Sequence, residues 1–372
     1  MRGALLFFVT LLPLFCLFFQ LTLTYQPTLN RVAINEALDA LALAPHHWSC
    51  GSISATALTA GVALHQLVCN GTSQTLRPDA GGPGFSQVDL SNVEIQVAIA
   101  DLTANGGLSI QPVVAQSNYP PEASPYRQTV LGMADWQCQQ GKSPIAGVNG
   151  GYFWFSPQDP KGLFFDSNCA AKDYLNFVNR SSYTTFDLGD GITVIDGQAF
   201  SWNCPTLGPH DAGQPQRAAV FHTAAGLSIA NLPAGPFNYS AMGIDMALGC
   251  GPMLIQNGSV AMQWQEIPST FEYSAYTGFA LASSLSDQHQ LGVFITCNGK
   301  DGQQGLHAWD LANFLLEMLP KLFKARVHSA LSFDQGGSTT MVIRNPVTLQ
   351  NELITSSGDD RSVFNALFLF EQ

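Results

Sequence analysis

The sequence predicts an α+β fold in which helices flank a mixed β-sheet core. Short apolar segments rich in β-branched residues recur along the chain, with turn residues between them. One amphipathic helix, expected over residues 310–319, lies between two such segments, and this order is typical of a crossover connection within one sheet. The chain has 372 residues, 46% of them hydrophobic, which is enough to bury a large core.

The N-terminal segment predicts an export signal or a membrane anchor. Residues 4–23 form an apolar run, and no charge follows it until Arg31. The length of the run suits a spanning helix, whereas Pro13 and Gln20 suit a cleaved signal peptide, so both alternatives stay open. Either one exports the rest of the chain to a periplasmic, extracellular or lumenal compartment, and an uncleaved segment would attach it to the membrane.

Composition excludes one class of partner. The chain has 27 acidic and 15 basic residues, a formal net charge of -12. Nucleic-acid binding needs clustered Lys and Arg, which this sequence does not offer. An anionic substrate would therefore depend on a few local cations.

The cysteines predict disulfides rather than a metal site. Seven of the eight cysteines lie beyond the apolar segment, and Cys50 with Cys69 is the simplest pair in an oxidising compartment, although spacing alone does not decide connectivity. No CxxC pair and no Cys/His cluster has the spacing of zinc ligands, so no metal site is predicted.

The elements follow from local patterns. β-branched or alternating stretches predict strands over these residues: 52–68, 88–102, 145–148, 192–195, 252–255, 291–296 and 330–333. Asp196-Gly197 is a hairpin-turn signal. The rest of region 154–237, rich in Pro, Gly, Asn and aromatic residues, is expected to form long surface loops. The helix is expected to begin with Asp310 as its N-cap and to end before Pro320.

The helix should bury one face. Its apolar residues recur at helical spacing. They are Leu311, Phe314, Leu315, Met318 and Leu319.

The stretch SFDQGGSTTM, residues 332–341, is the strongest candidate for a site. Asp334 follows an apolar strand, and Gly336 and Gly337 allow backbone geometries in which successive N–H groups form an anion-binding nest. Ser338 and Thr339 add hydroxyl donors, and a helix beginning at Ser338 would add its positive end. A carboxylate beside a bound phosphate is favourable only if it acts on a neighbouring carbon, positions a water or shares a cation with the phosphate.

A second motif, NGGYF, repeats this arrangement behind the strand over 145–148. Asn149 is followed by Gly150 and Gly151, and the ring of Tyr152 can form a wall for a sugar. The alternative is an ordinary hairpin corner. Gly249-Cys250-Gly251 is a further place where backbone could approach a ligand.

Two more segments supply charge. Lys300 and Asp301 precede the helix, and His307 can act as an acid or base because its ordinary pKa lies near neutrality. The alternative is a plain turn and a helix-capping histidine. The forked guanidinium of Arg361 suits phosphate better than an ammonium does.

Together these motifs resemble the phosphodiester glycosidase family, which has bacterial members associated with exopolysaccharide. The resemblance runs from about Ile95 to Phe370 and rests on five motifs in the family's order. They are NGGYF, GCGPMLIQNG (249–258), Asp301-Gly302-x-x-Gly305, FDQGGSTTM (333–341) and R-S-V-x-N-A-L (361–367). The resemblance implies that the chain has three parts: a signal or anchor over 1–24, a strand-rich extension over 25–94 and a catalytic domain over 95–372.

The resemblance implies hydrolysis of a sugar-1-phosphodiester at its glycosidic carbon, with release of the free sugar. Asp334 would take the carboxylate role, with Asp301 and His307 as further candidates for acid or base. Residues 335–339 and Arg361 would hold the phosphate, together with Lys300. Asn149 to Tyr152 would orient the sugar. No cofactor is identified, and a divalent cation between Asp334 and the phosphate stays open.

Two positions depart from the family pattern. Gln335 stands where relatives often have glycine, and Tyr276 stands where many carry arginine. The second departure keeps an alternative function open, that of a non-catalytic exported protein that binds glycans or phosphoglycans.

Overall fold

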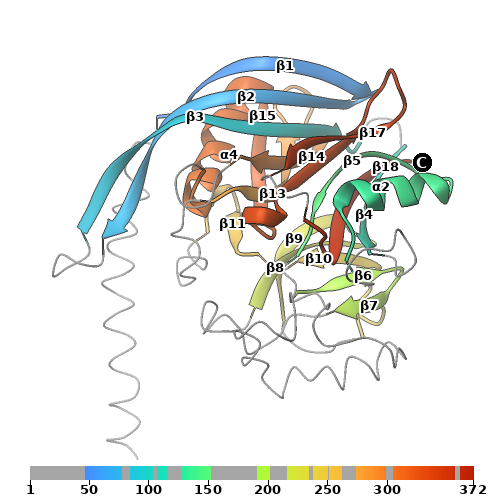
Figure 1. Cartoon of the computed structure of the whole chain (residues 1–372). Coiled ribbons are helices and arrows are strands. Elements are labelled where there is room, and N and C mark those ends of the chain that lie inside the picture. The colour runs from blue at the N-terminus through green and yellow to red at the C-terminus, as the bar shows by residue number, and fades with distance from the viewer. Residues whose placement is uncertain are drawn as a thin grey trace, which may run out of the picture. The chain divides into compact units, whose positions relative to one another are not determined.

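The computed structural model describes residues 47–77, 84–103, 107–115, 127–151, 191–201, 216–233, 238–249, 251–261, 274–298, 305–356 and 361–372. Within these ranges the chain forms three antiparallel sheets and two α-helices, which confirms the α+β class (Figure 1). The chain divides into two compact units, residues 1–46 with 74–88 and residues 47–73 with 89–372. The apolar segment expected over 4–23 lies outside the described residues.

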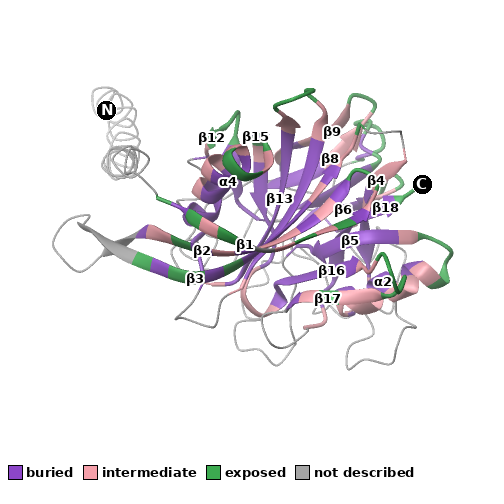
Figure 2. Cartoon of the chain, turned by 90° about the horizontal axis from the view of Figure 1, so that it is seen from above, coloured by how far each residue is buried: buried purple, intermediate pink, exposed green. Residues whose placement is uncertain are grey.

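The first sheet has eight strands, and its centre is deeply buried. Purple covers most of β13 in Figure 2. In spatial order the strands are β1 (Ser49–Thr59), β2 (Val62–Arg77), β3 (Gly84–Asp101), β14 (Gln290–Cys297), β13 (Tyr276–Ser284), β15 (Ala325–Ser332), β11 (Met253–Gln256) and β12 (Ser259–Val260). Both β14 and β15 pair antiparallel with β13, so they run parallel to each other with β13 between them. The predicted crossover is therefore confirmed.

Helix α4 (Ala308–Phe323) makes this crossover and packs against β15 and β11. All five apolar residues predicted for its inner face are buried. The predicted N-cap is wrong by three residues: His307 is the N-cap, and the Asp310 side chain reaches back to accept the His307 amide at 2.9 Å. Pro320 also lies inside the helix rather than ending it. It removes one hydrogen bond close to the C-terminus, and Lys324 ends the helix in a left-handed conformation.

The second sheet corrects the expectation of long loops. Its strands, in spatial order, are β7 (Gln198–Ser201), β6 (Thr193–Ile195), β10 (Met246–Gly249), β8 (Gln216–Thr223) and β9 (Gly226–Pro233). Three of them, β7, β8 and β9, fall in the region expected to form loops. Each has few β-branched residues among polar and small ones, so its strand structure depends on burial. The predicted Asp196-Gly197 turn is confirmed, with φ of 52° and 74°. Burial in the core of this sheet raises the pKa of Tyr239 to about 12.

The third sheet carries α2 (Val130–Gln139), a helix that the sequence patterns did not reveal. Its strands, in spatial order, are β17 (Asn351–Ser356), β16 (Thr340–Arg344), β5 (Ser143–Asn149), β18 (Asn365–Glu371) and β4 (Leu108–Val114). The Thr129 hydroxyl caps α2 by accepting the Gly132 amide at 3.0 Å. The helix buries Val130 and Met133 against this sheet, in a cluster with Phe368.

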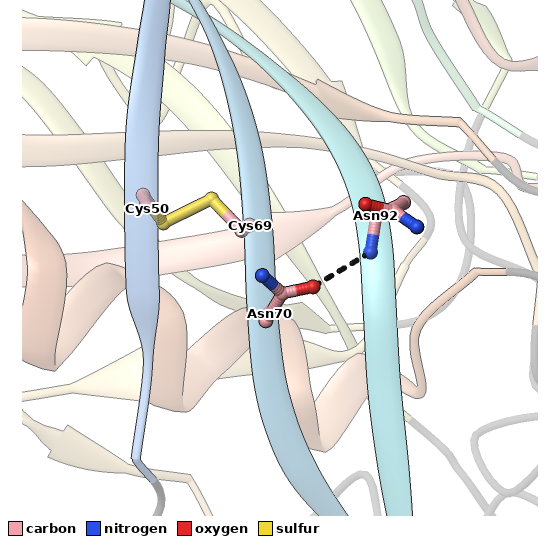
Figure 3. Close-up of a disulfide and its surroundings, with 4 residues drawn as sticks. All are labelled: Cys50, Cys69, Asn70 and Asn92. Carbon is pink, nitrogen blue, oxygen red and sulfur yellow. Dashed lines mark hydrogen bonds between the residues drawn. A yellow bond between two sulfur atoms is a disulfide. The ribbon is translucent and has the colours of Figure 1, made fainter.

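The predicted Cys50–Cys69 disulfide is confirmed. The two cysteines face each other in the β1–β2 register, and the bridge joins these strands (Figure 3). Next to it, the Asn70 side chain accepts the backbone amide of Asn92 in β3 at 2.9 Å. Among the described cysteines, Cys138 and Cys297 are free thiols.

Candidate functional site

Asn149, the last residue of β5, links the first and third sheets. It is fully buried, and its amide nitrogen donates to the backbone carbonyl of Asp334 at 2.8 Å. Its side-chain oxygen accepts the Thr277 hydroxyl at 2.6 Å and the Thr340 amide at 3.0 Å. The side chain predicted to contact a sugar is thus committed within the protein, where it holds the Asp334 backbone.

Asn365, the first residue of β18, fixes the Gly150–Gly151 turn. Its side-chain oxygen accepts the Gly151 amide at 2.7 Å, and its backbone carbonyl accepts the Gly150 amide at 2.9 Å. A methyl group on Gly150 would lie 2.2 Å from that side-chain oxygen, so the turn needs glycine there. The Asn365 amide nitrogen donates to the hydroxyl of Thr193 in β6 at 2.8 Å. These contacts place the turn where the third sheet meets the second.

Asp334 lies directly after β15 between these two links. Its backbone amide donates to the Gly150 carbonyl at 2.9 Å, and the preceding Phe333 amide donates to the Thr277 carbonyl at 2.8 Å. The carboxylate accepts the Gln335 amide at 2.9 Å, and the residue is 8% exposed. The structure therefore brings Asp334 and the NGGYF glycines together, as the sequence predicted.

The stretch after Asp334 is a single 3₁₀ turn, η5 (Gly336–Ser338), and β16 follows it. No helix begins at Ser338, which corrects that expectation, because strand pairing with β5 and β17 captures the chain from Thr340 onward. Gly336 has φ of 65°, and its amide donates to the Ala275 carbonyl at 2.9 Å. The Thr339 amide donates to the Gly336 carbonyl at 3.0 Å. Part of the expected nest is thus used internally.

Three hydroxyls of this stretch are buried without a hydrogen-bond partner among the described residues. They belong to Ser338, Thr339 and Thr340. A buried hydroxyl without a partner costs about 1–3 kcal/mol, and such groups mark places where a ligand or water supplies the missing bond.

Arg361 packs on the same turn. A methyl group added to Gly337 would lie 2.2 Å from an Arg361 terminal nitrogen, so the guanidinium rests against the Gly337 α-carbon. The sequence predicted both residues at one site, and the structure places them in contact.

The other predicted residues divide into two groups. Tyr152, Lys300 and Asp301 lie outside the described residues. His307 is 3% exposed at the start of α4, and the preceding Leu306 pairs with Ser274 through two 3.0 Å backbone hydrogen bonds. The histidine is the N-cap residue of α4, and the Leu306–Ser274 pairing places it close to Ala275, whose carbonyl accepts the Gly336 amide.

Asp310, three residues after His307, is a fully buried acid with a raised pKa. Its carboxylate accepts the Ser73 hydroxyl at 2.8 Å in addition to the His307 amide. Complete burial raises its pKa to about 7, although these two hydrogen bonds act in the opposite direction.

Tyr276, where we expect a departure from the family pattern, is the first residue of β13. It is 1% exposed, and its backbone amide donates to the Cys297 sulfur at 3.2 Å. Burial raises the pKa of that thiol to about 12. Gly251 likewise contacts protein rather than a ligand, because a methyl group on it would lie 1.6 Å from the Ser332 carbonyl oxygen.

Sequence reasoning overlooked the roles of Thr277 and Asn365. Each is a polar residue at the start of an otherwise apolar strand, as in YTGFALA and NALFLF. Asn149 shows the converse pattern, because it is a polar residue at the end of the apolar strand β5.

The described residues contain no group of three or more His, Cys, Asp or Glu side chains arranged to hold a metal ion. None of their helices combines the length and apolarity needed to cross a membrane.

Residues 142–370 match the family model of the phosphodiester glycosidases. The chain belongs to this family. The matched range contains every described residue of the site, from Asn149 to Asn365. The phosphodiester glycosidase resemblance predicted from five motifs is thereby confirmed.

Solved structures with similarity to this chain share little sequence with it. The catalytic domain of zebrafish N-acetylglucosamine-1-phosphodiester alpha-N-acetylglucosaminidase, auto-inhibited by its pro-peptide, is 14% identical, with a TM-score of 0.47 over 87% of this chain and 88% of that one. A hypothetical protein from Synechocystis is 13% identical, with a TM-score of 0.47 over 89% and 64%. A putative exported protein from Burkholderia pseudomallei is 12% identical, with a TM-score of 0.44 over 88% and 98%. No curated protein matches the chain in sequence.

Proposed function

We propose that the protein hydrolyses the glycosidic bond of a sugar-1-phosphodiester, of the kind formed by N-acetylglucosamine-1-phosphate and an alcohol. Water adds its oxygen to the anomeric carbon, the bond from that carbon to the phosphate oxygen breaks, and the phosphate stays on the other product. The proposal rests on one observation above all: an almost buried carboxylate, Asp334, directly precedes a turn on which the Arg361 guanidinium packs.

The turn supplies what a departing phosphate needs. Arg361 provides the local cation that an overall charge of -12 makes necessary. The buried hydroxyls of Ser338 and Thr339, which have no hydrogen-bond partner among the described residues, offer donors. Because the leaving group is a phosphate monoester, which departs as a stabilised anion, the reaction depends less on a strong acid than ordinary glycoside hydrolysis does.

Asp334 then acts on the sugar side, as nucleophile or as the base that activates water. Asn149 is a positioning residue, because its amide holds the Asp334 carbonyl and it has no exposed surface. Tyr152, Lys300 and Asp301 keep their predicted roles as part of the proposal. His307 is the N-cap residue of α4 through its backbone amide, and its side chain keeps the predicted role of a further candidate acid or base.

Export is the proposed setting. The Cys50–Cys69 bridge supports it, because disulfides persist in oxidising compartments. A role in envelope or exopolysaccharide metabolism is the finer proposal.

The test is release of free sugar from a panel of UDP-sugars and from methyl-phospho-N-acetylglucosamine. The Asp334→Asn variant should lose at least about a hundredfold in rate while its melting temperature stays close to that of the parent. Asp287→Asn changes an exposed acid in the β13–β14 turn and serves as the matched control. Full activity in Asp334→Asn would refute the role assigned to this carboxylate.

One observation favours a second candidate, a non-catalytic exported protein that binds glycans or phosphoglycans. Tyr276 is buried where relatives often have arginine, so one cation of the family pattern is missing. Binding of these substrates without any release of sugar, even after Tyr276→Arg, would support this second function.

A further inference from the structure

Two adjoining hollows lie away from the Asp334 site. The first, of about 450 Å³, is lined by parts of β4, β8, β10 and the β6–β7 turn. The second, of about 400 Å³, is lined by parts of β9, β11, β13 and β15. They share Leu227 and Gln290, so they form one groove, which we call the β9 groove. Each volume falls in the range of small-molecule sites, about 300–1,000 Å³.

A histidine and a carboxylate are paired in the first hollow. Nδ1 of His222 lies 2.9 Å from both carboxylate oxygens of Asp245. This contact fixes the ring and places the proton on Nδ1. Nε2 is then the nitrogen that can bind a hydroxyl group of a ligand. Leu108 and Pro112 line the same hollow and offer apolar surface.

The second hollow has hydroxyl and amide groups. The Ser283 hydroxyl lies 2.6 Å from Nε2 of His328, and both residues line the hollow. Gln256 and Asn257 add amide side chains. The groove thus alternates hydrogen-bonding groups with apolar side chains.

Charge decides which ligand fits. Among the described residues that line the two hollows there is no Lys or Arg, whereas Asp196 and Asp245 line the first. A phosphate or carboxylate would meet repulsion there, in contrast to the turn beside Arg361. A metal ion is not favoured either, since no cluster of three suitable side chains occurs among the described residues. Sugar rings combine apolar faces with uncharged hydroxyls and match this lining.

We propose that the β9 groove binds a neutral oligosaccharide and that it is a site separate from the one around Asp334. None of its lining residues belongs to that site. The inference does not depend on the proposed hydrolysis, because binding is measured without turnover.

The test uses the full chain and three neutral probes: maltotriose, cellotriose and triacetylchitotriose. Titration calorimetry measures the affinity, and hydrogen exchange locates the site. At least one probe should bind and should protect Gly226–Ile229 and Leu108–Pro112, and UDP-N-acetylglucosamine, aimed at the Asp334 site, should not displace it. His222→Ala should weaken binding about tenfold, the effect of one lost hydrogen bond to a polarised group. Leu227→Ala should weaken it by removing surface shared by both hollows.

His289→Ala is the matched control. His289 also pairs with an aspartate, Asp101 at 2.7 Å, but does not line the groove, so its loss should leave affinity unchanged. Absence of binding by all three probes at about 10 mM would overturn the proposal. So would protection confined to Asp334–Thr340, or equal affinity in the parent, His222→Ala and Leu227→Ala. Sugar release in the separate assay is expected to be unaffected by His222→Ala, so failure of the groove and failure of the hydrolytic function remain distinguishable.

Discussion

Replacing Asp310 with asparagine should change how the stability of the protein depends on pH. Asp310 is fully buried, and its carboxylate accepts hydrogen bonds from Ser73 and from the His307 amide. Burial raises its pKa from 3.8 to about 7. The asparagine side chain has nearly the same shape and keeps an oxygen that accepts both bonds, but it never ionises.

The direction in which the free energy of unfolding changes with pH follows from the protons bound by the folded and unfolded chains. Between pH 3.8 and about 7 the unfolded chain has lost this proton while the folded protein still holds it. The free energy of unfolding contributed by Asp310 therefore falls as pH rises through this window and levels off above about 7. The slope is roughly 1 kcal/mol per pH unit, and the whole change is on the order of 4 kcal/mol.

The assay is urea unfolding of the parent and Asp310→Asn at several values between pH 5 and pH 8. The difference in unfolding free energy between the two proteins cancels all other titrating groups. It should shift in favour of the variant by roughly 1 kcal/mol per pH unit up to about 7. Asp287→Asn is the control, because that carboxyl is exposed and its pKa is lowered, first by the Ser284 hydroxyl. Parallel curves for the parent and Asp310→Asn would refute the argument that burial keeps this acid protonated.

Three further predictions concern structure. Cys50→Ser should lower the free energy of unfolding by about 3 kcal/mol, because the bridge closes a loop whose ends are 19 residues apart. Reduction of the parent protein should cause the same loss. Equal urea midpoints for the parent and Cys50→Ser would contradict this prediction. Gly251→Ala should destabilise by more than about 3 kcal/mol, since the added methyl meets the backbone of Ser332, which cannot rotate away. Gly51→Ala, with open space around it and no left-handed backbone, is the comparison for melting temperature. Asn149→Ala leaves three buried groups without partners and should cost about 3–5 kcal/mol; an unchanged unfolding midpoint would show that water replaces the amide.

Several features could be predicted from the sequence because their causes are local. The crossover helix followed from apolar residues at helical spacing, and the Asp196-Gly197 turn from two residues that accept a left-handed backbone. The end of the same helix could not be placed, since Pro320 is tolerated by a helix whose apolar face is already buried. Only β6 of the second sheet was predicted, because a segment such as β8 becomes a strand only when β9 and β10 pair with it.

The candidate site also has features that could be predicted from the sequence and features that could not. Asp334, Gly337 and Arg361 could be named from residue type and motif order, because a carboxylate, a glycine pair and a guanidinium carry their chemistry with them. Their arrangement could not be predicted, because it depends on hydrogen bonds made by the buried side chains of Asn149, Thr277 and Asn365. These bonds join residues up to 214 positions apart in the chain. The sequence by itself determined which chemical groups and which local turns the protein has. Only the tertiary structure decided that Asn149 supports Asp334 instead of touching a ligand, because burial and hydrogen-bond partners come from strands that meet after folding.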